Sequence, residues 1–240
     1  GRNKVMFGYS LNYLIDMENA VIVDVEATPT RISKEVEATE TMIERTQQRF
    51  DLKPDHLAGD VAYGTGKMLG WLVERGIEPH VPVWDKSNRK DDTFSRSGFT
   101  YDRDRDLYIC PANKTLKTTG NIGPSNTLRY FSSKHDCSTC SLKAKCCLRT
   151  PSRKVTRDIN EAARDHARFL NGSEAYNQSA RDRKKIERLF GEAKRNMAMT
   201  RLRLRGLSGA KDEFLLTATV QNLKRLIKHA SRPPPRPIMA

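Results

Sequence analysis

The chain has 240 residues and a mass of 27.3 kDa, with 37% hydrophobic and 30% charged residues. This length suits one large domain, or one domain with a small inserted module, and it can bury a substantial core. No stretch approaches the roughly 20 continuous apolar residues of a membrane span. The first nine residues lack the basic-then-apolar layout of a secretory signal. We therefore expect neither an integral membrane protein nor a secreted one.

The charge is strongly basic and unevenly distributed. Lys and Arg number 43 against 29 acidic residues, which gives a net charge of +14 and a pI near 9.7. Residues 1–50 hold six basic and eight acidic residues, whereas residues 181–211 hold eleven basic and three acidic ones. A general solubility effect would not require this concentration, so we expect a polyanionic partner, most commonly nucleic acid.

The first 83 residues predict an α/β layer. Apolar residues occupy every second position from Val5 to Ile15, residues 16–20 read as a turn, and Val21, Val23 and Val25 resume the alternation, which predicts a β-hairpin. A helix over 32–50 follows, with Ser33 as its cap, then a strand over 56–60, a helix over 65–75 ended by a glycine, and a strand over 77–83. The resulting β-β-α-β-α-β order is typical of strands covered by helices.

Residues 84–157 predict an irregular, cysteine-rich insertion with short strand-like pieces at 99–101 and 107–110, and not more sheet. Residues 158–230 predict helices that complete the core. Their apolar candidates are Ile186, Leu189, Phe190, Ala193 and Met197, then Phe214, Leu215, Ala218, Leu223, Leu226 and Ile227 in a last helix over 213–229. The Pro-rich residues 231–240 predict an extended or disordered tail.

Three charged side chains share one line of a predicted helix. At 100° per residue, Arg183 lies about 40° and Lys194 about 20° from Glu187, and Gly191 leaves that line free of bulk. A carboxylate between two cations suits chemistry on a metal-bound phosphate, because the acid can hold a hard cation and the cations can hold phosphate oxygens. Spacing alone favours an exposed face of salt bridges.

Asp60 is the second candidate for a metal-binding carboxylate. It closes a short predicted strand, at the carboxyl end where α/β sheets place their sites. An aspartate that caps a turn or helix is the common alternative, so Asp60 alone is a weak signal.

In combination these features resemble a ribonuclease H-like fold that lacks its first strand. The segments FGYSLNYLID, GDVAYGTGKMLGWLVERGIEPHVP, RDRKKIERLFGEAKRNMAMTRLRLRGL and EFLLTATVQNLKRLIK, with the cysteine-bearing insertion, resemble the catalytic domain of bacterial insertion-sequence DDE transposases over nearly the whole chain. The family signature Tyr-(2)-Arg-(3)-Glu-(6)-Lys maps onto Ala180, Arg183, Glu187 and Lys194, so its tyrosine is absent.

Members of the family also carry an aspartate that is followed three residues later by a tyrosine. Asp60 and Tyr63 fit this pattern, and Ala62 stands where glycine is frequent. The resemblance implies an enzyme that cuts and joins DNA with two Mg²⁺ (or Mn²⁺) ions held by three carboxylates. Asp60 and Glu187 would be two of the ligands and should converge in space.

By the same resemblance, Arg183 and Lys194 would contact DNA phosphate or position the helix. The family's first aspartate lies on a strand before FGY, and neither Asp16 nor Asp24 holds its position. We therefore expect a fragment or truncated descendant that binds metal weakly and binds DNA without cutting it. Its expected setting is the bacterial cytoplasm, with transposon ends and target DNA as partners. A homo-oligomer on DNA is left open.

All five cysteines lie within residues 110–147, whereas a secreted disulfide scaffold would spread them along the chain. A CxxC pair at 137–140 has one cysteine before it and two after it. The four thiolates of a tetrahedral zinc site would come from Cys110, Cys137, Cys140 and one of Cys146 and Cys147, with His135 as a substitute ligand. Free buried cysteines are an equal alternative.

The alternating run of Arg201, Arg203 and Arg205 predicts a phosphate-contacting loop or strand, and a solvated charged edge is the simpler alternative. The leading hypothesis is a DNA transposase catalytic core. The alternatives are a non-catalytic DNA-binding remnant with structural zinc, and a related nuclease of the same fold.

Overall fold

The computed structural model describes residues 8–30, 32–85 and 91–231. It is a mixed α/β structure that divides into two compact units, one built from residues 1–63, 76–81 and 170–240 and the other from 64–75 and 82–169. The expected start of the first strand at Val5, the Ser33 side chain and the tail beyond residue 231 lie outside the described parts. Among the helices of these ranges, none has the length and apolar character that crossing a membrane requires.

The first unit begins with the predicted hairpin. Strands β1 (Tyr9–Asp16) and β2 (Val21–Pro29) pair antiparallel. The carboxylate of Asp16 accepts hydrogen bonds from the backbone N–H groups of Glu18 and Asn19, at 3.1 and 3.2 Å, and so closes the turn. The hairpin prediction is confirmed.

A β-bulge interrupts the alternation expected in the second strand. Leu14 pairs with Asp24 but Ile15 pairs with Ile22, so Val23 is an extra residue in β2. The bulge changes which side chains face the core. Consequently Ile22 is buried and Val21 is 37% exposed, and the expected regular series through Val21, Val23 and Val25 is wrong.

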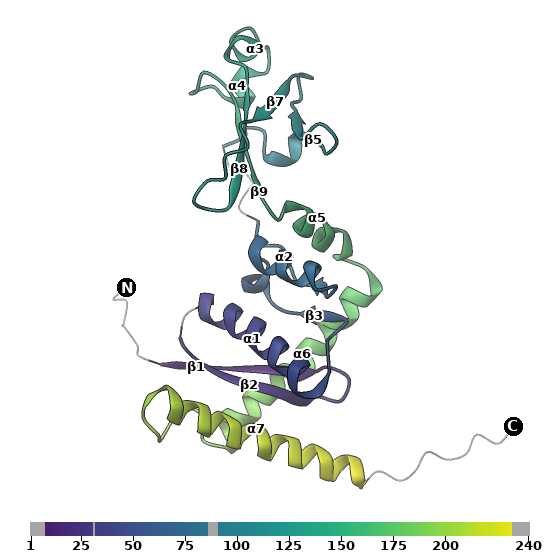
Figure 1. The fold of residues 1–240 in the computed structure, drawn as a ribbon, viewed down its shortest axis with the longest axis vertical. Helices are drawn as coiled ribbons and strands as arrows, with labels where there is room; N and C mark the ends of the chain where they lie inside the picture. The colour runs from purple at the N-terminus through teal and green to yellow at the C-terminus, as the bar shows by residue number, and fades with distance from the viewer. Residues whose placement is uncertain (1–7, 31, 86–90, 232–240) are drawn as a thin grey trace, which may run out of the picture. The chain divides into compact units, whose positions relative to one another are not determined.

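Helices cover both faces of the hairpin, with α1 (Ile32–Phe50) on one side and α7 (Gly206–Ala230) on the other (Figure 1). On the α1 side, Arg45 forms ion pairs of 2.7 Å with both Asp24 and Glu26. The opposite face packs on α7 and on α6 (Glu174–Asn196). Its buried core consists of Ile22, Val25, Ala27, Ile186, Leu189, Ala210, Phe214 and Ala218.

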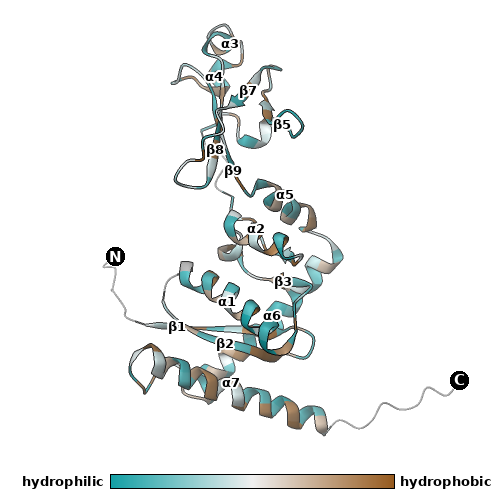
Figure 2. Ribbon diagram, in the orientation of Figure 1, coloured by the Kyte–Doolittle hydropathy of each residue, from teal (hydrophilic) through white to brown (hydrophobic). Residues whose placement is uncertain are grey.

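The inner face of α7 differs from the one expected. Phe214 and Ala218 are buried as predicted, but Leu215, Leu223, Leu226 and Ile227 are exposed. Hydrophobic bands therefore recur along α7 without belonging to the core (Figure 2). The inner stripe uses small or polar residues instead, including the fully buried Gln221, whose side chain donates a hydrogen bond to the Leu189 carbonyl at 2.9 Å.

The predicted β-α-β order continues with β3 (His56–Ala58), the 3₁₀ turn η1 (Val61–Tyr63), α2 (Gly66–Glu74) and β4 (Glu78–His80). Strands β3 and β4 pair in parallel. His80 connects β4 to α6, because its Nδ1 lies 2.7 Å from the Ser179 hydroxyl while its ring stacks on His56 at 4.6 Å.

The second unit contains a sheet that the sequence did not predict. Five strands form one antiparallel sheet in chain order: β5 (Thr100–Asp102), β6 (Leu107–Ile109), β7 (Thr115–Thr118), β8 (Thr127–Ser132) and β9 (Lys154–Asp158). Its apolar face buries Phe99, Tyr108, Leu116, Tyr130 and Val155. The strand-like pieces expected at 99–101 and 107–110 correspond to β5 and β6. The irregular insertion expected around them is instead a five-stranded sheet, because strands of three to six residues are too short for alternation to stand out.

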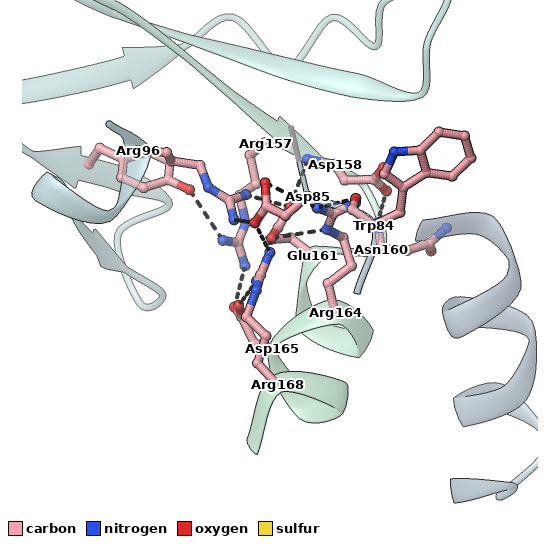
Figure 3. Close-up of polar contacts among 11 residues, drawn as sticks. Trp84, Asp85, Arg96, Arg157, Asp158, Asn160, Glu161, Arg164, Asp165 and Arg168 are labelled. Carbon is pink, nitrogen blue, oxygen red and sulfur yellow. Dashed lines mark hydrogen bonds and ion pairs between the residues drawn. The ribbon is translucent and has the colours of Figure 1, made fainter. Parts of the chain in front are cut away.

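Short helices complete this unit: η2 (Arg96–Gly98), α3 (Lys134–Ser138), α4 (Lys143–Cys146) and α5 (Glu161–Leu170). Glu161, which is only 2% exposed, is surrounded by three arginines (Figure 3). Its carboxylate lies 2.6 Å from Arg96, 2.8 Å from Arg168 and 3.3 Å from Arg164. We call these four residues the Glu161 cluster.

Candidate functional site

Asp60 lies two residues beyond the end of β3 and is exposed, so the strand expected over 56–60 ends before it. Its Oδ1 accepts the backbone N–H of Ala62 at 2.8 Å, and its carbonyl accepts that of Tyr63 at 3.2 Å. Asp60 thus caps the η1 turn. The ring of Tyr63 lies over Gly59, where a Cβ would come within 3.1 Å of it, so this glycine lets the turn close beside the ring.

Glu187 lies on the exposed side of α6. Its Oε1 is 3.1 Å from Nη1 of Arg183, which is the i,i+4 salt bridge that spacing alone favoured. Gly191 leaves the helix surface open as expected, since the nearest atom to a Cβ there is an Arg195 nitrogen at 3.5 Å. Both carboxylates therefore have local structural partners.

The predicted convergence of Asp60 and Glu187 stays a prediction. Both residues belong to the first unit, and α6 packs against β3. No hydrogen bond or ion pair joins them within the described ranges. Nor does any group of three or more His, Cys, Asp or Glu side chains in those ranges have an arrangement that would hold a metal ion as it stands.

A cleft of about 880 Å³ gathers three of the predicted basic residues in the first unit. Lys194 of α6, together with Arg201 and Arg205 from the segment before α7, lines this cleft. Tyr63 and Glu35 line it as well, which brings the turn capped by Asp60 to its edge. Burial raises the pKa of Tyr63, so its phenol remains a neutral hydrogen-bonding group near pH 7.

The arginine segment is held in place through its backbone. The N–H groups of Arg203 and Leu204 donate to the Glu213 carboxylate at 2.7 and 2.6 Å. The side chains of Arg201, Arg203 and Arg205 are exposed, and no carboxylate of the described residues forms an ion pair with them. The three guanidinium groups are thus available to an external anion. Nothing in the sequence pattern marks Glu213, because its partners are backbone groups.

The cysteines of the second unit also come together. All five line a single small cavity between the β6–β7 turn and helices α3 and α4. They are free thiols, with Cys137 and Cys147 buried. Residues far apart in the sequence therefore meet as the zinc hypothesis required, without adopting a ligating arrangement.

A protein-family model described as "Transposase DDE domain" matches residues 109–227. The matched span includes the cysteines, Arg183, Glu187 and Lys194, while Asp60 precedes it. No curated protein and no solved structure matches the chain. The chain, whose mixed α/β fold is consistent with a ribonuclease H-like domain, therefore contains a transposase domain, and such a domain implies DNA as the partner. More narrowly, it carries the DDE transposase domain that the resemblance to insertion-sequence enzymes predicted.

Proposed function

We propose that this chain forms the catalytic core of a transposase that cuts and joins DNA by metal-dependent phosphodiester transfer. The observation that carries the proposal is the transposase DDE domain at 109–227, which spans Arg183, Glu187 and Lys194. Its substrates would be transposon ends and target DNA. Assembly of several copies on that DNA forms part of the proposal.

Asp60 and Glu187 are the proposed ligands of Mg²⁺ or Mn²⁺. Carboxylate oxygens are the donors that these hard cations prefer, and both side chains are exposed to solvent. When bound, the metal would stabilise the charge that develops around phosphorus. Arg183 orients Glu187 through their 3.1 Å contact.

The basic residues are proposed to hold the DNA backbone. Lys194, Arg201 and Arg205 line the same cleft, and Arg203 lies between the two arginines in sequence. Exposed cations without carboxylate partners can bind phosphate oxygens without first breaking an internal ion pair. This arrangement supports DNA as the partner.

Mn²⁺ binding to the 240-residue chain, followed by electron paramagnetic resonance, tests the metal ligands. We expect Asp60→Asn and Glu187→Gln each to weaken binding at least tenfold. Glu74→Gln, at an exposed carboxylate at the end of α2, should leave it unchanged. Equal Mn²⁺ affinity in all four proteins would contradict the assignment.

The chemistry is tested with the purified protein, using supercoiled DNA and Mg²⁺. Cutting and joining, both lost in Glu187→Gln, would support a transposase. Cutting without joining would indicate a nuclease.

A non-catalytic DNA-binding protein is the second candidate function. It is favoured by the local structural roles of Asp60 in its turn and Glu187 in its salt bridge. DNA binding without cutting in the same assay would support it. In either case we propose zinc, and not magnesium, for the cysteines of the second unit.

A further inference from the structure

The cysteine cavity has the size of a single ion. Its volume is about 20 Å³, which is room for roughly one water-sized sphere. The five thiols come from three places in the second unit. One belongs to the residue after β6, two to α3 and the loop that follows it, and two to the end of α4 and the residue after it. The five cysteines are Cys110, Cys137, Cys140, Cys146 and Cys147.

The turn at Cys110 directs backbone N–H toward its sulfur. Lys114 donates its N–H to Cys110 Sγ at 3.3 Å, while Cys110 donates its own N–H to the Lys114 carbonyl at 2.8 Å. Asn113 adopts a positive φ of 56°, which asparagine tolerates, and this lets the turn close. A hydrogen bond to sulfur stabilises a thiolate, the form that binds metal.

Basic groups outnumber acidic ones around the cavity. Lys114, Lys143 and Arg153 line it, against the single carboxylate of Asp136. Arg153 is only 7% exposed and donates to the Cys146 carbonyl at 2.8 Å. Four thiolates and one Zn²⁺ carry a net charge of −2, which needs nearby cations when it is partly buried.

The fourth ligand comes from the adjacent pair Cys146 and Cys147. Both line the cavity, Cys146 as the last residue of α4 and Cys147 as the residue after it. The two thiols are therefore equivalent candidates for this position.

We propose that Cys110, Cys137, Cys140 and one of Cys146 and Cys147 bind one Zn²⁺ in a tetrahedral structural site, with the other cysteine of that pair beside it as a non-ligand. In the structure, the thiols have other contacts instead, such as the 3.0 Å contact between Cys137 Sγ and the Ser132 hydroxyl. Ligation requires the side chains to turn about their Cα–Cβ bonds between staggered rotamers. The site would fix the β6–β7 turn to α3 and α4, and it does not depend on the proposed DNA chemistry.

Metal content of the 240-residue chain, purified under reducing conditions without chelator, is the first test. We expect about one zinc per chain. Replacement with Co²⁺ should give the intense visible bands of tetrahedral cobalt and the near-ultraviolet absorption of four thiolate ligands. These spectra are recorded on the unaltered protein, so they do not depend on any variant folding. Absence of zinc and of these bands would overturn the proposal.

Serine variants then test which thiols are ligands. Cys110→Ser and Cys140→Ser should each lose the tetrathiolate cobalt spectrum. One of Cys146→Ser and Cys147→Ser should also lose it, while the other of that pair keeps it. A spectrum retained in Cys110→Ser, or in both variants of the adjacent pair, would overturn the assignment of the ligands. Removal of zinc with EDTA should lower the melting temperature of the unaltered chain, and an unchanged value would contradict a structural role.

Discussion

The carboxylate of Glu161 is almost completely buried, yet cations surround it where apolar groups would be expected. Burial raises its pKa, but hydrogen bonds from Arg96 and Arg168 outweigh that effect and lower the pKa to about 2. Because the folded-state pKa lies below the ordinary value of 4.5, the cluster stabilises the fold above about pH 4.5. That stabilisation is lost as the pH falls toward 2.

Glu161→Gln should therefore destabilise the chain by roughly 3 kcal/mol at pH 7, because it removes the buried one of the two carboxylates, Glu161 and Asp85, that the three arginines share. The difference from the unaltered protein should shrink between pH 4.5 and pH 2. Denaturant unfolding at several pH values measures this. Asp104→Asn, in an exposed loop of the same unit, is the control. A difference that is independent of pH would show that the charge of Glu161 is not responsible.

Replacement by alanine should have opposite effects on stability at two glycines, Gly64 and Gly191. A Cβ on Gly64 would lie 1.9 Å from the Pro82 carbonyl oxygen, which belongs to the backbone and cannot easily move. Gly64→Ala should lower the free energy of unfolding by about 1–3 kcal/mol through overpacking. Gly191 lies inside α6 with ordinary space around its Cβ position, so Gly191→Ala should stabilise the chain by about 0.5–1 kcal/mol. Melting temperatures that move in the same direction would contradict this assignment.

At the scale of elements, α7 shows what hydrophobic periodicity can and cannot determine. Phe214 is 3% exposed and packs in the core of the first unit, whereas Leu226 is 63% exposed. Phe214→Ala should cost about 3–5 kcal/mol, and Leu226→Ala about 0.5 kcal/mol or less. Urea unfolding compares the two. Equal losses would mean that the outer face of α7 is covered in solution.

The sequence predicted the positions of helices and strands better than it predicted which of their faces are buried. The hairpin, the β-α-β order and the helices through Ile186 and Phe214 followed from periodicity and turn residues. The bulge at Val23 did not, because it depends on pairing across the hairpin. The buried face of α7 could not be predicted from periodicity either, because apolar residues lie on both sides of this helix. The five-stranded sheet was missed because each strand is so short.

Some features of the candidate site could likewise be predicted from the sequence, and others could not. The chain pattern correctly indicated the transposase domain, and the structure gathers Lys194, Arg201 and Arg205 in one cleft. The contribution of Glu213 was not predictable, since it binds backbone N–H groups nine and ten residues away. Helix spacing alone correctly favoured a salt bridge for Glu187.

At the scale of the whole molecule, the net charge of +14 is carried mainly toward the C-terminal part of the first unit, where residues 181–211 hold eleven basic residues and three acidic ones. A protein that binds DNA through such a surface releases counterions from the phosphate backbone. The logarithm of its binding constant should therefore fall linearly with the logarithm of salt concentration. Because the proposed contacts are to phosphate, binding by this chain should not depend strongly on DNA sequence.

The combined variant Arg201→Ala, Arg203→Ala and Arg205→Ala should weaken binding to unrelated duplexes by similar factors. Its salt slope should fall by roughly 0.9 for each phosphate that the variant no longer neutralises. Fluorescence anisotropy at several salt concentrations measures both quantities. The control removes the same charge from exposed positions of the second unit, through Arg103→Ala, Lys117→Ala and Arg149→Ala. If only the first variant flattens the slope, the arginine segment binds DNA directly. If both flatten it equally, overall charge explains the binding and the cleft has no special role.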